Sequence, residues 1–373
     1  MKKIIFLTGT RADFGKIKSL LKILEADSNF TPYIFATGMH LQHKYGFTVM
    51  EIEKSGFQEI HTFDNQSAQG KMDTNLAKTI EGFSDYVKKL NPDLIIVHGD
   101  RVETLAGAIV GALNNILVAH IEGGEISGTI DELIRHSVSK LSHIHFVSNS
   151  IAANRLRQMG ELKKSIFEIG SPDIDVMFSS NLPGLQVVKG YYEIPFESYA
   201  IAMFHPITTE FNNMQENANK FVAALLQDTT NYVVIYPNND LGCETIFKAY
   251  KQLSENNRFR IFSSLRFEYF LTLLSNAQFI IGNSSAGIYE APYYKVPTVN
   301  IGNRQKNRLY KGEIIHCPYD TKSICKAIKK AHKHKPNDLQ NFFGHGNSSK
   351  LFLKVLKTEQ FWELRKQKQF QEI

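Results

Sequence analysis

The sequence predicts an α/β protein made of two domains, each with a parallel sheet. The chain has 373 residues, more than the roughly 250–300 residues over which a single core normally extends. Short apolar runs recur along it, each followed by a small or polar turn and often by a stretch with helical periodicity. Such alternation of strands and helices is typical of doubly wound sheets.

Eight apolar runs are the expected strands. They are continuous rather than alternating, as in strands that are buried on both faces of a parallel sheet. They cover residues 4–7, 94–97, 116–119, 144–147, 199–204, 232–235, 279–281 and 298–301. Helical periodicity follows the first three of these runs, over residues 19–25, 103–113 and 132–141, respectively. The pattern fits two Rossmann-like domains.

A change of composition marks the expected domain boundary. Residues 171–197 contain three prolines and two glycines, Pro172, Pro183, Pro195, Gly184 and Gly190, which is typical of a linker. We therefore expect an N-terminal domain over residues 1–175 and a C-terminal domain over residues 190–350. Residues 351–370 have the periodicity of a last helix and contain the only tryptophan, Trp362.

The composition indicates the cellular compartment and the kinds of binding partner that we expect. The net charge of +6 fits either a solvated lysine surface or an anionic ligand such as a nucleotide diphosphate. No basic helix, zinc pattern or aromatic RNA motif indicates a nucleic-acid partner. The three cysteines form no CxxC pair, so we expect neither a disulfide framework nor a zinc site. No apolar run reaches the roughly 18 residues of a membrane span, and no signal peptide is evident. We expect a cytoplasmic protein without a membrane partner.

Ligands of open α/β sheets bind beyond the carboxyl ends of the strands, so the residues there are candidates. After the first run, Arg11 could hold an anion at a helix N-terminus; a purely structural turn is the alternative. The turn lacks GxGxxG and the acidic residue about 20 positions on that an NAD site requires. After the second run, Asp100 is a candidate catalytic carboxylate or, equally, a helix N-cap.

The third run leads into a loop with four carboxylates, Glu122, Glu125, Asp131 and Glu132. Crowded carboxylates raise one another's pKa values, which would make one of them an acid or base near neutral pH. An oxygen-rich metal site is the competing interpretation. Four basic residues follow at helical spacing, and we expect at least one of them to face the site: Arg135, His136, Lys140 and His143.

The C-terminal half carries the nucleotide signals. Small hydroxyl residues at a helix start offer backbone amides and oxygens to an anion, a carboxylate further along could reach ribose hydroxyls, and two arginines could neutralise phosphate. A capped helix with surface arginines is the alternative. Together with Arg11 of the N-terminal half, the predicted binding residues are Asn238, Arg266, Ser284, Ser285, Gly287, Glu290, Arg304 and Arg308. Either Tyr269 or Phe270 could lie beside a uracil, or both could be helix core.

Four motifs together resemble the UDP-N-acetylglucosamine 2-epimerases, in particular the hydrolysing branch of bacterial sialic acid synthesis. They are His98-Gly99-Asp100-Arg101, Ile121-Glu122-Gly123-Gly124-Glu125 with Asp131, Ile169-Gly170-Ser171-Pro172-Asp173, and Gly282-Asn283-Ser284-Ser285-Ala286-Gly287. The resemblance covers essentially the whole chain. It implies a glycosyltransferase B-type architecture, with a cleft between two domains and a final helix, within residues 351–373, that packs on the N-terminal domain. The non-hydrolysing relatives have Glu-Ala-Gly where this chain has Glu122-Gly123-Gly124, and a threonine-rich segment after the catalytic Asp that it lacks, which favours hydrolysis.

The resemblance also implies an activity. A UDP-sugar, UDP-N-acetylglucosamine, would be converted to N-acetylmannosamine and UDP by anti elimination of UDP and hydration of the resulting glycal. Asp100, Glu122 and Asp131 would be catalytic. His205, at a strand end before Pro206, could assist at the leaving group, and a structural histidine is the alternative. No cofactor and no metal would be needed, and a homodimer or homotetramer is expected.

Three alternatives remain open at this point. The chain could be a hydrolysing 2-epimerase of another nucleotide sugar, either diacetamido-trideoxy or GDP-linked. It could be a glycosyltransferase of the same architecture, which would need an acceptor. It could be a non-catalytic sugar-nucleotide sensor, although the carboxylate-rich loop argues against a protein that only binds a dianion.

Overall fold

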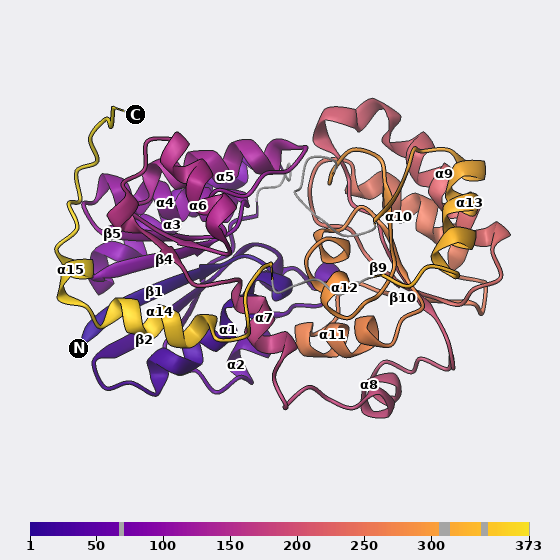
Figure 1. Cartoon of the computed structure of the whole chain (residues 1–373), viewed down its shortest axis with the longest axis horizontal. Helices are drawn as coiled ribbons and strands as arrows, with labels where there is room; N and C mark the ends of the chain where they lie inside the picture. The colour runs from indigo at the N-terminus through magenta and orange to yellow at the C-terminus, as the bar shows by residue number, and fades with distance from the viewer. Residues whose placement is uncertain (67–70, 306–313, 337–341, 373) are drawn as a thin grey trace. The chain divides into compact units, whose positions relative to one another are not determined.

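The computed structural model describes residues 1–66, 71–305, 314–336 and 342–372. The chain folds into two compact units. Unit 1 comprises Met1–Glu125, Asp131–Ser179 and Asn341–Ile373, and unit 2 comprises Ile126–Ile130 and Ser180–Gln340. Each unit has its own parallel sheet with helices packed on it (Figure 1). The predicted α/β class with two Rossmann-like sheets is confirmed.

Unit 1 is built on a seven-stranded sheet in the order β3-β2-β1-β4-β5-β6-β7. Its strands are β1 (Lys2–Thr8), β2 (Phe30–Ala36), β3 (Ile60–Thr62), β4 (Leu94–His98), β5 (Leu117–Ile121), β6 (Ile144–Val147) and β7 (Ile166–Glu168). The order reverses between β1 and β4, and such a reversal opens a crevice at the carboxyl ends of the strands. Figure 1 shows α3 (Met72–Leu90) and α4 (Val102–Leu113) on one face of this sheet, with α1 (Arg11–Glu25) on the other.

Unit 2 repeats the same design with a six-stranded sheet in the order β10-β9-β8-β11-β12-β13. Its strands are β8 (Ala200–Met203), β9 (Tyr232–Ile235), β10 (Phe259–Phe262), β11 (Ile280–Gly282), β12 (Thr298–Ile301) and β13 (Ile315–Cys317). The strand order reverses between β8 and β11. Gly282 ends β11 with φ +138°, and a side chain there would begin 1.8 Å from the Met203 carbonyl oxygen of β8.

All eight predicted strands are present, and five further strands, β2, β3, β7, β10 and β13, are not among the predictions. Four of these, β3, β7, β10 and β13, are the outermost strands of their sheets. An edge strand tolerates polar side chains because one side of it lacks a neighbouring strand, so its apolar run is interrupted. The fifth, β2, contains Thr31 and Pro32 next to each other, and a proline argues against a central strand.

The helices begin and end where local capping dictates. α1 starts at Arg11, earlier than expected, because the Thr10 hydroxyl accepts a hydrogen bond from the Asp13 amide at 3.1 Å. The second and third predicted helices agree closely with α4 and with α5 (Ile130–Leu141). The proline-rich stretch after residue 170 is partly helical, with α7 (Pro172–Met177) and α8 (Leu185–Tyr191).

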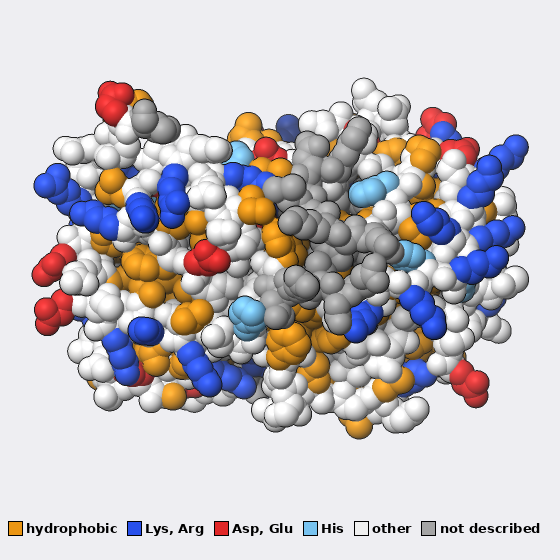
Figure 2. All heavy atoms as spheres, viewed as in Figure 1, with side chains coloured by type: hydrophobic (Ala, Val, Ile, Leu, Met, Phe, Trp, Pro, Cys, Tyr) orange, Lys and Arg blue, Asp and Glu red, His pale blue; other side chains and the backbone are white. Residues whose placement is uncertain are grey.

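The lysine excess of the C-terminal part is exposed on one helix. In α13 (Thr321–Ala331), Lys322, Lys326, Lys329 and Lys330 are exposed, and Figure 2 shows blue side chains gathered over this helix. Among the helices that the structure describes, none is long and apolar enough to cross a membrane.

The predicted single C-terminal helix is wrong. Two short helices, α14 (Ser348–Leu356) and α15 (Glu359–Trp362), are separated by Thr358, whose backbone is extended (ψ 135°). Within unit 1, the ring of Phe352 on α14 packs edge-on against Phe6 and Phe146, with centroids 6.4 and 4.9 Å apart. Because the chain leaves helical geometry at Thr358, the residues after Trp362 form an irregular tail.

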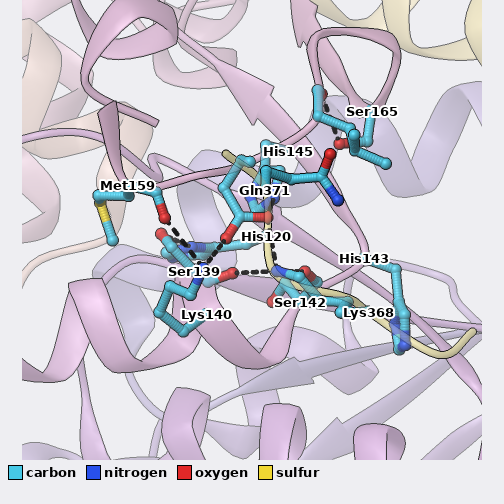
Figure 3. Close-up of polar contacts among 12 residues, drawn as sticks. His120, Ser139, Lys140, Ser142, His143, His145, Met159, Ser165, Lys368 and Gln371 are labelled. Carbon is cyan, nitrogen blue, oxygen red and sulfur yellow. Dashed lines mark hydrogen bonds and ion pairs between the residues drawn. The ribbon is translucent and has the colours of Figure 1, made fainter. Parts of the chain in front are cut away.

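That tail is anchored to the end of α5 (Figure 3). The Lys368 ammonium donates to the carbonyl oxygens of Ser139 and Ser142 at 3.2 and 2.7 Å, and pairs with Glu161 at 2.5 Å. His145 of β6 lies 2.9 Å from the same carboxylate. A cation at the C-terminus of a helix is favourable because the last carbonyls carry partial negative charge. The tail therefore stabilises α5, which carries Asp131 in its first turn.

Candidate active site

The first element of the unit 1 site is the start of α1. One oxygen of Asp13 accepts the amide of Gly9 at 3.1 Å, and the other lies 2.7 Å from Nδ1 of His98, the last residue of β4. Lys16 follows three residues after Asp13, on the same helix. The carboxyl ends of β1 and β4 are thereby joined through side chains.

Asp100 follows β4 in a tight turn. Gly99 has φ +77°, and its amide donates to the carbonyl of Ile121 at 3.0 Å. The Asp100 carboxylate forms an ion pair with Arg135 of α5, whose side chain is almost fully buried. Asp100 is therefore not the N-cap of α4, a position that Arg101 occupies. Of the four basic residues predicted after the carboxylate-rich loop, Arg135 is the one that pairs with Asp100 of this turn.

His120 of β5 connects that turn to α5. Its Nε2 lies 2.8 Å from the Gly99 carbonyl and its Nδ1 3.0 Å from the hydroxyl of Ser139, which Figure 3 shows beside it. A carbonyl only accepts, so Nε2 carries the proton and Nδ1 accepts from Ser139. Burial lowers the pKa of His120 to about 3. The ring is neutral and holds the Asp100 turn against the helix that carries Arg135.

Glu122 stands at the end of β5 with φ +67°, an unusual backbone conformation for a residue with a side chain. Its Oε1 lies 3.7 Å from the Lys16 ammonium and 3.5 Å from Nε2 of His98. Burial disfavours the charged carboxylate, but Lys16, His98 and Arg135 outweigh that effect and hold the pKa of Glu122 well below its usual range. The expectation that crowded acids raise this pKa is wrong, because the neighbours of Glu122 are cations.

The other acids of the loop have different surroundings. Glu125 is buried and accepts a hydrogen bond from the Ser148 hydroxyl at 2.5 Å, and Glu132 lies 3.6 Å from His136, one turn along α5. Asp131 is half-buried on the same helix. In the part of the chain that the structure describes, no group of three His, Cys, Asp or Glu residues could hold a metal ion.

Several residues of this site were not among the predicted ones, and Lys16 and Asp173 are two of them. Lys16 bridges Glu122 and Asp173, whose carboxylate lies 3.4 Å from the Lys16 ammonium and is fully buried. Asp173 belongs to the Gly-Ser-Pro-Asp motif, where it stands in the first turn of α7. Its position in a motif was a usable signal, whereas the sequence offers none for Lys16 because the contact is tertiary.

The unit 2 site is organised around Asn283, which follows β11. Its side-chain oxygen accepts the amide of His205 at 2.6 Å and its side-chain nitrogen donates to the His205 carbonyl at 2.9 Å. The Asn238 amide donates to Nδ1 of His205 at 3.1 Å. Because Nδ1 accepts, the neutral ring carries its proton on Nε2. Residues that follow β8, β9 and β11 thus form one connected group.

Arg304 and Gln305, after β12, join the same group. Both donate to the Asn283 carbonyl, at 3.1 and 2.9 Å, and both are buried. The loop Ile126–Ile130 also packs here, since the Gly128 amide donates to the Arg304 carbonyl at 3.1 Å. Predicted Arg308 lies outside the described residues.

The predicted serine-rich helix start is a single 3-10 turn, η6 (Ser285–Gly287), followed by α12 (Glu290–Tyr293). The Ser284 hydroxyl accepts the Ala286 amide at 3.3 Å. Packing explains the glycine at position 287, because a side chain there would begin 2.6 Å from the methyl group of Thr298. Glu290 is buried at the start of α12.

The remaining predicted residues lie at other places in the two units. Arg11, in the first turn of α1, is 3.8 Å from Glu51. The guanidinium of Arg266 stacks over Tyr191 and Tyr269, 4.9 and 5.5 Å from their ring centres. Phe270 is buried.

Unit 1 thus presents an ionised Glu122 and an Asp100–Arg135 pair at the carboxyl ends of neighbouring strands, and unit 2 presents a histidine, small polar residues and an arginine. A family model, UDP-N-acetylglucosamine 2-epimerase, matches residues 22–357. The chain belongs to this family. A member named UDP-N-acetylglucosamine 2-epimerase from Neisseria meningitidis serogroup B is 47% identical over 99% of both chains.

A second relative supports the family, and a solved structure supports the fold. A Legionella pneumophila relative named UDP-N,N'-diacetylbacillosamine 2-epimerase (hydrolyzing) is 33% identical over 96% of both chains. The crystal structure of UDP-GlcNAc 2-epimerase from Neisseria meningitidis bound to UDP-GlcNAc superposes with a TM-score of 0.78 at 18% identity, covering 95% of this chain and 99% of that one. At that identity the likeness supports the fold alone.

Proposed function

We propose that the chain is a hydrolysing 2-epimerase that converts UDP-N-acetylglucosamine to N-acetylmannosamine and UDP. The observation that carries the proposal is Glu122, a carboxylate held ionised on a strained backbone beside the Asp100–Arg135 pair. The 47% identical Neisseria relative supports the choice of substrate. The product would serve sialic acid synthesis, as the sequence resemblance implies.

The reaction calls for this kind of site. The hydrogen at C2 of the sugar is not acidic, so direct deprotonation would leave an unstabilised carbanion. Expulsion of UDP from C1 while C2 loses its proton forms a glycal instead. Water then adds across the double bond, its oxygen to C1 and a proton to C2, which inverts C2. Each step moves a proton, and positioned acids and bases typically accelerate such steps about 10²–10⁴-fold.

The carboxylates of unit 1 are assigned to the proton transfers. Glu122 enters the reaction ionised, which is the form that can accept a proton. Asp100 is oriented by Arg135, which His120 and Ser139 support through the Asp100 turn. Asp131, on the helix that carries Arg135, completes the set.

The residues of unit 2 are assigned to the nucleotide. His205 is oriented by Asn283 and Asn238 with its proton on Nε2, so it can donate to an oxygen of the departing diphosphate. Arg304 offers positive charge, and Ser284 and Ser285 offer hydroxyls and amides. Fixed donors aimed at developing charge are the form of catalysis that needs least reorganisation.

A second substrate has support from one relative. The Legionella protein named for UDP-N,N'-diacetylbacillosamine is 33% identical, against 47% for the Neisseria protein. The test is a panel of UDP-N-acetylglucosamine, UDP-N,N'-diacetylbacillosamine and its GDP counterpart, without any acceptor. We expect fastest UDP release from the first, together with free N-acetylmannosamine. An epimerised sugar that remains attached to UDP would contradict hydrolysis, and release only when an acceptor is added would indicate a glycosyltransferase.

A further inference from the structure

Three side chains from three elements form a line in unit 1. Asp13 of α1 lies 2.7 Å from Nδ1 of His98, and Nε2 of His98 lies 3.5 Å from Glu122. His98 ends β4 and is only 7% exposed. Asp13 is itself fixed, because its second oxygen accepts the Gly9 amide. The imidazole is therefore enclosed between two carboxylates, one of them anchored to the backbone.

We infer that His98, held by Asp13, is a positioning residue that fixes the Glu122 carboxylate for the reaction. This inference rests on the proposed function only in assigning Glu122 to the chemistry. Glu122 has φ +67°, and a strained backbone of this kind persists only where its surroundings over-determine it. His98, on the neighbouring strand β4, supplies a charged contact to Glu122, the residue whose backbone is strained.

At neutral pH, His98 between its two carboxylates has no part as a proton acceptor. Burial opposes a charged ring, but Glu122 and the hydrogen bond to Asp13 outweigh it and raise the pKa of His98 to about 10. An imidazolium has two donors and no lone pair, so at neutral pH the ring only donates. Loss of its proton would leave two carboxylates facing a neutral ring.

Other charged groups also face this line and set the background for any titration. From α1 comes Lys16, 3.7 Å from Glu122; from α7 comes Asp173, paired with Lys16; from α5 comes Arg135, paired with Asp100. His120 of β5 is neutral. Because Lys16 and Arg135 remain when His98 is replaced, the carboxylate keeps part of its stabilisation.

The first test replaces His98 by Gln, which keeps a donor but removes the charge. An opposite charge within about 4–6 Å typically shifts a carboxyl pKa by about 1–3 units. The titration midpoint of Glu122 in His98→Gln should therefore rise by about 1–3 pH units. The readout is the carbon-13 shift of the Glu122 carboxyl, assigned with Glu122→Gln, in the free protein. The acid limb of kcat/KM should move in the same direction, with kcat lowered about tenfold or more.

The second test, Asp13→Asn, works on the opposite side of the ring. Removing this carboxylate lowers the pKa of His98 from about 10, so the ring titrates at lower pH and the basic limb of kcat/KM moves down by about 1–3 units. The Glu122 midpoint should not rise. The two variants thus move opposite limbs, which loss of folding alone would not produce.

His145→Gln is the matched control. His145, labelled in Figure 3, is fully buried on β6 and lies 2.9 Å from Glu161, so the variant removes a buried histidine–carboxylate pair other than the one at Glu122. His145→Gln should leave the acid limb and the basic limb of the kcat/KM pH profile unchanged. An unchanged Glu122 midpoint in His98→Gln overturns the inference, as does a change equal to that of the control. Since the carboxyl titration needs no substrate, failure of the proposed function is seen separately, as absence of UDP release by the unaltered enzyme.

Discussion

Replacement of Lys16 by Met should weaken unit 1 strongly. The Lys16 ammonium lies 3.7 Å from Glu122 and 3.4 Å from Asp173, and its side chain is 12% exposed. Methionine keeps the length and apolar stem of lysine but provides no charge. Two buried carboxylates would then lose the cation that they share.

The size of the effect follows from these distances. At an effective dielectric constant of about 20, a pair of unit charges 3.4–3.7 Å apart interacts by about 4–5 kcal/mol. Two such contacts are offset by the cost of burying the ammonium, which is several kcal/mol. Removing one partner of a buried pair typically costs about 3–5 kcal/mol, and we expect Lys16→Met to lower the free energy of unfolding of unit 1 by that amount.

Trp362, the only tryptophan, lies in unit 1, so urea unfolding followed by its fluorescence reports on this unit. Lys140→Met is the control: Lys140 pairs with Glu161 at 2.9 Å but is 52% exposed, and the buried Glu161 keeps Lys368 and His145 as partners, so the loss of Lys140 should cost less than about 1 kcal/mol. Glu122 has a lowered pKa, so its stabilisation is present above its unfolded value and is lost as the pH falls. The deficit of Lys16→Met should therefore shrink below about pH 4.5. Equal deficits in the two variants would refute the reasoning.

Three further predictions concern separate features of the chain. Asp100→Asn, Glu122→Gln and Asp131→Asn should each lose most turnover, about 10²-fold or more, while the far-UV circular dichroism spectrum of the folded protein persists; normal turnover in any one would remove that residue from the proposed site. Lys368→Met should lower the free energy of unfolding of unit 1 by about 1–3 kcal/mol, because it removes the hydrogen bonds that Lys368 donates. The difference in urea midpoint from the unaltered protein should disappear between about pH 4.5 and 2, because the partners of Glu161 lower its pKa to about 2 and the carboxylate becomes protonated over that range. Gly282→Ala should abolish folding of unit 2, since its side chain would meet the Met203 carbonyl at 1.8 Å, whereas Gly184→Ala, with nothing within 4 Å, should behave normally in far-UV circular dichroism.

The central strands could be predicted from sequence because burial on both faces leaves continuous apolar runs, as in β4, β5 and β9. The edge strands could not, because a strand such as β10, Phe-Arg-Ile-Phe, needs only part of its surface buried. The C-terminal segment has helical periodicity throughout, yet Thr358 and the anchoring of Lys368 take the chain out of the helix. Tertiary contacts decided this segment rather than propensity.

The strand-end positions of the site residues were predictable, because a parallel sheet presents its carboxyl ends along one edge. The charge state of Glu122 was not. Its sequence neighbours are acids, whereas its spatial neighbours are Lys16 and His98, which come from other elements. Arg135 is the intermediate case, since its helix was predicted but its contact with Asp100 depends on tertiary packing.

The isotopic composition of the product tests the proposed reaction most directly. After incubation with UDP-N-acetylglucosamine in D₂O, the account predicts free N-acetylmannosamine with deuterium at C2. In ¹⁸O-water, it predicts label at C1 of the sugar and none in the UDP. Label in the phosphate would mean cleavage of the P–O bond and would contradict elimination.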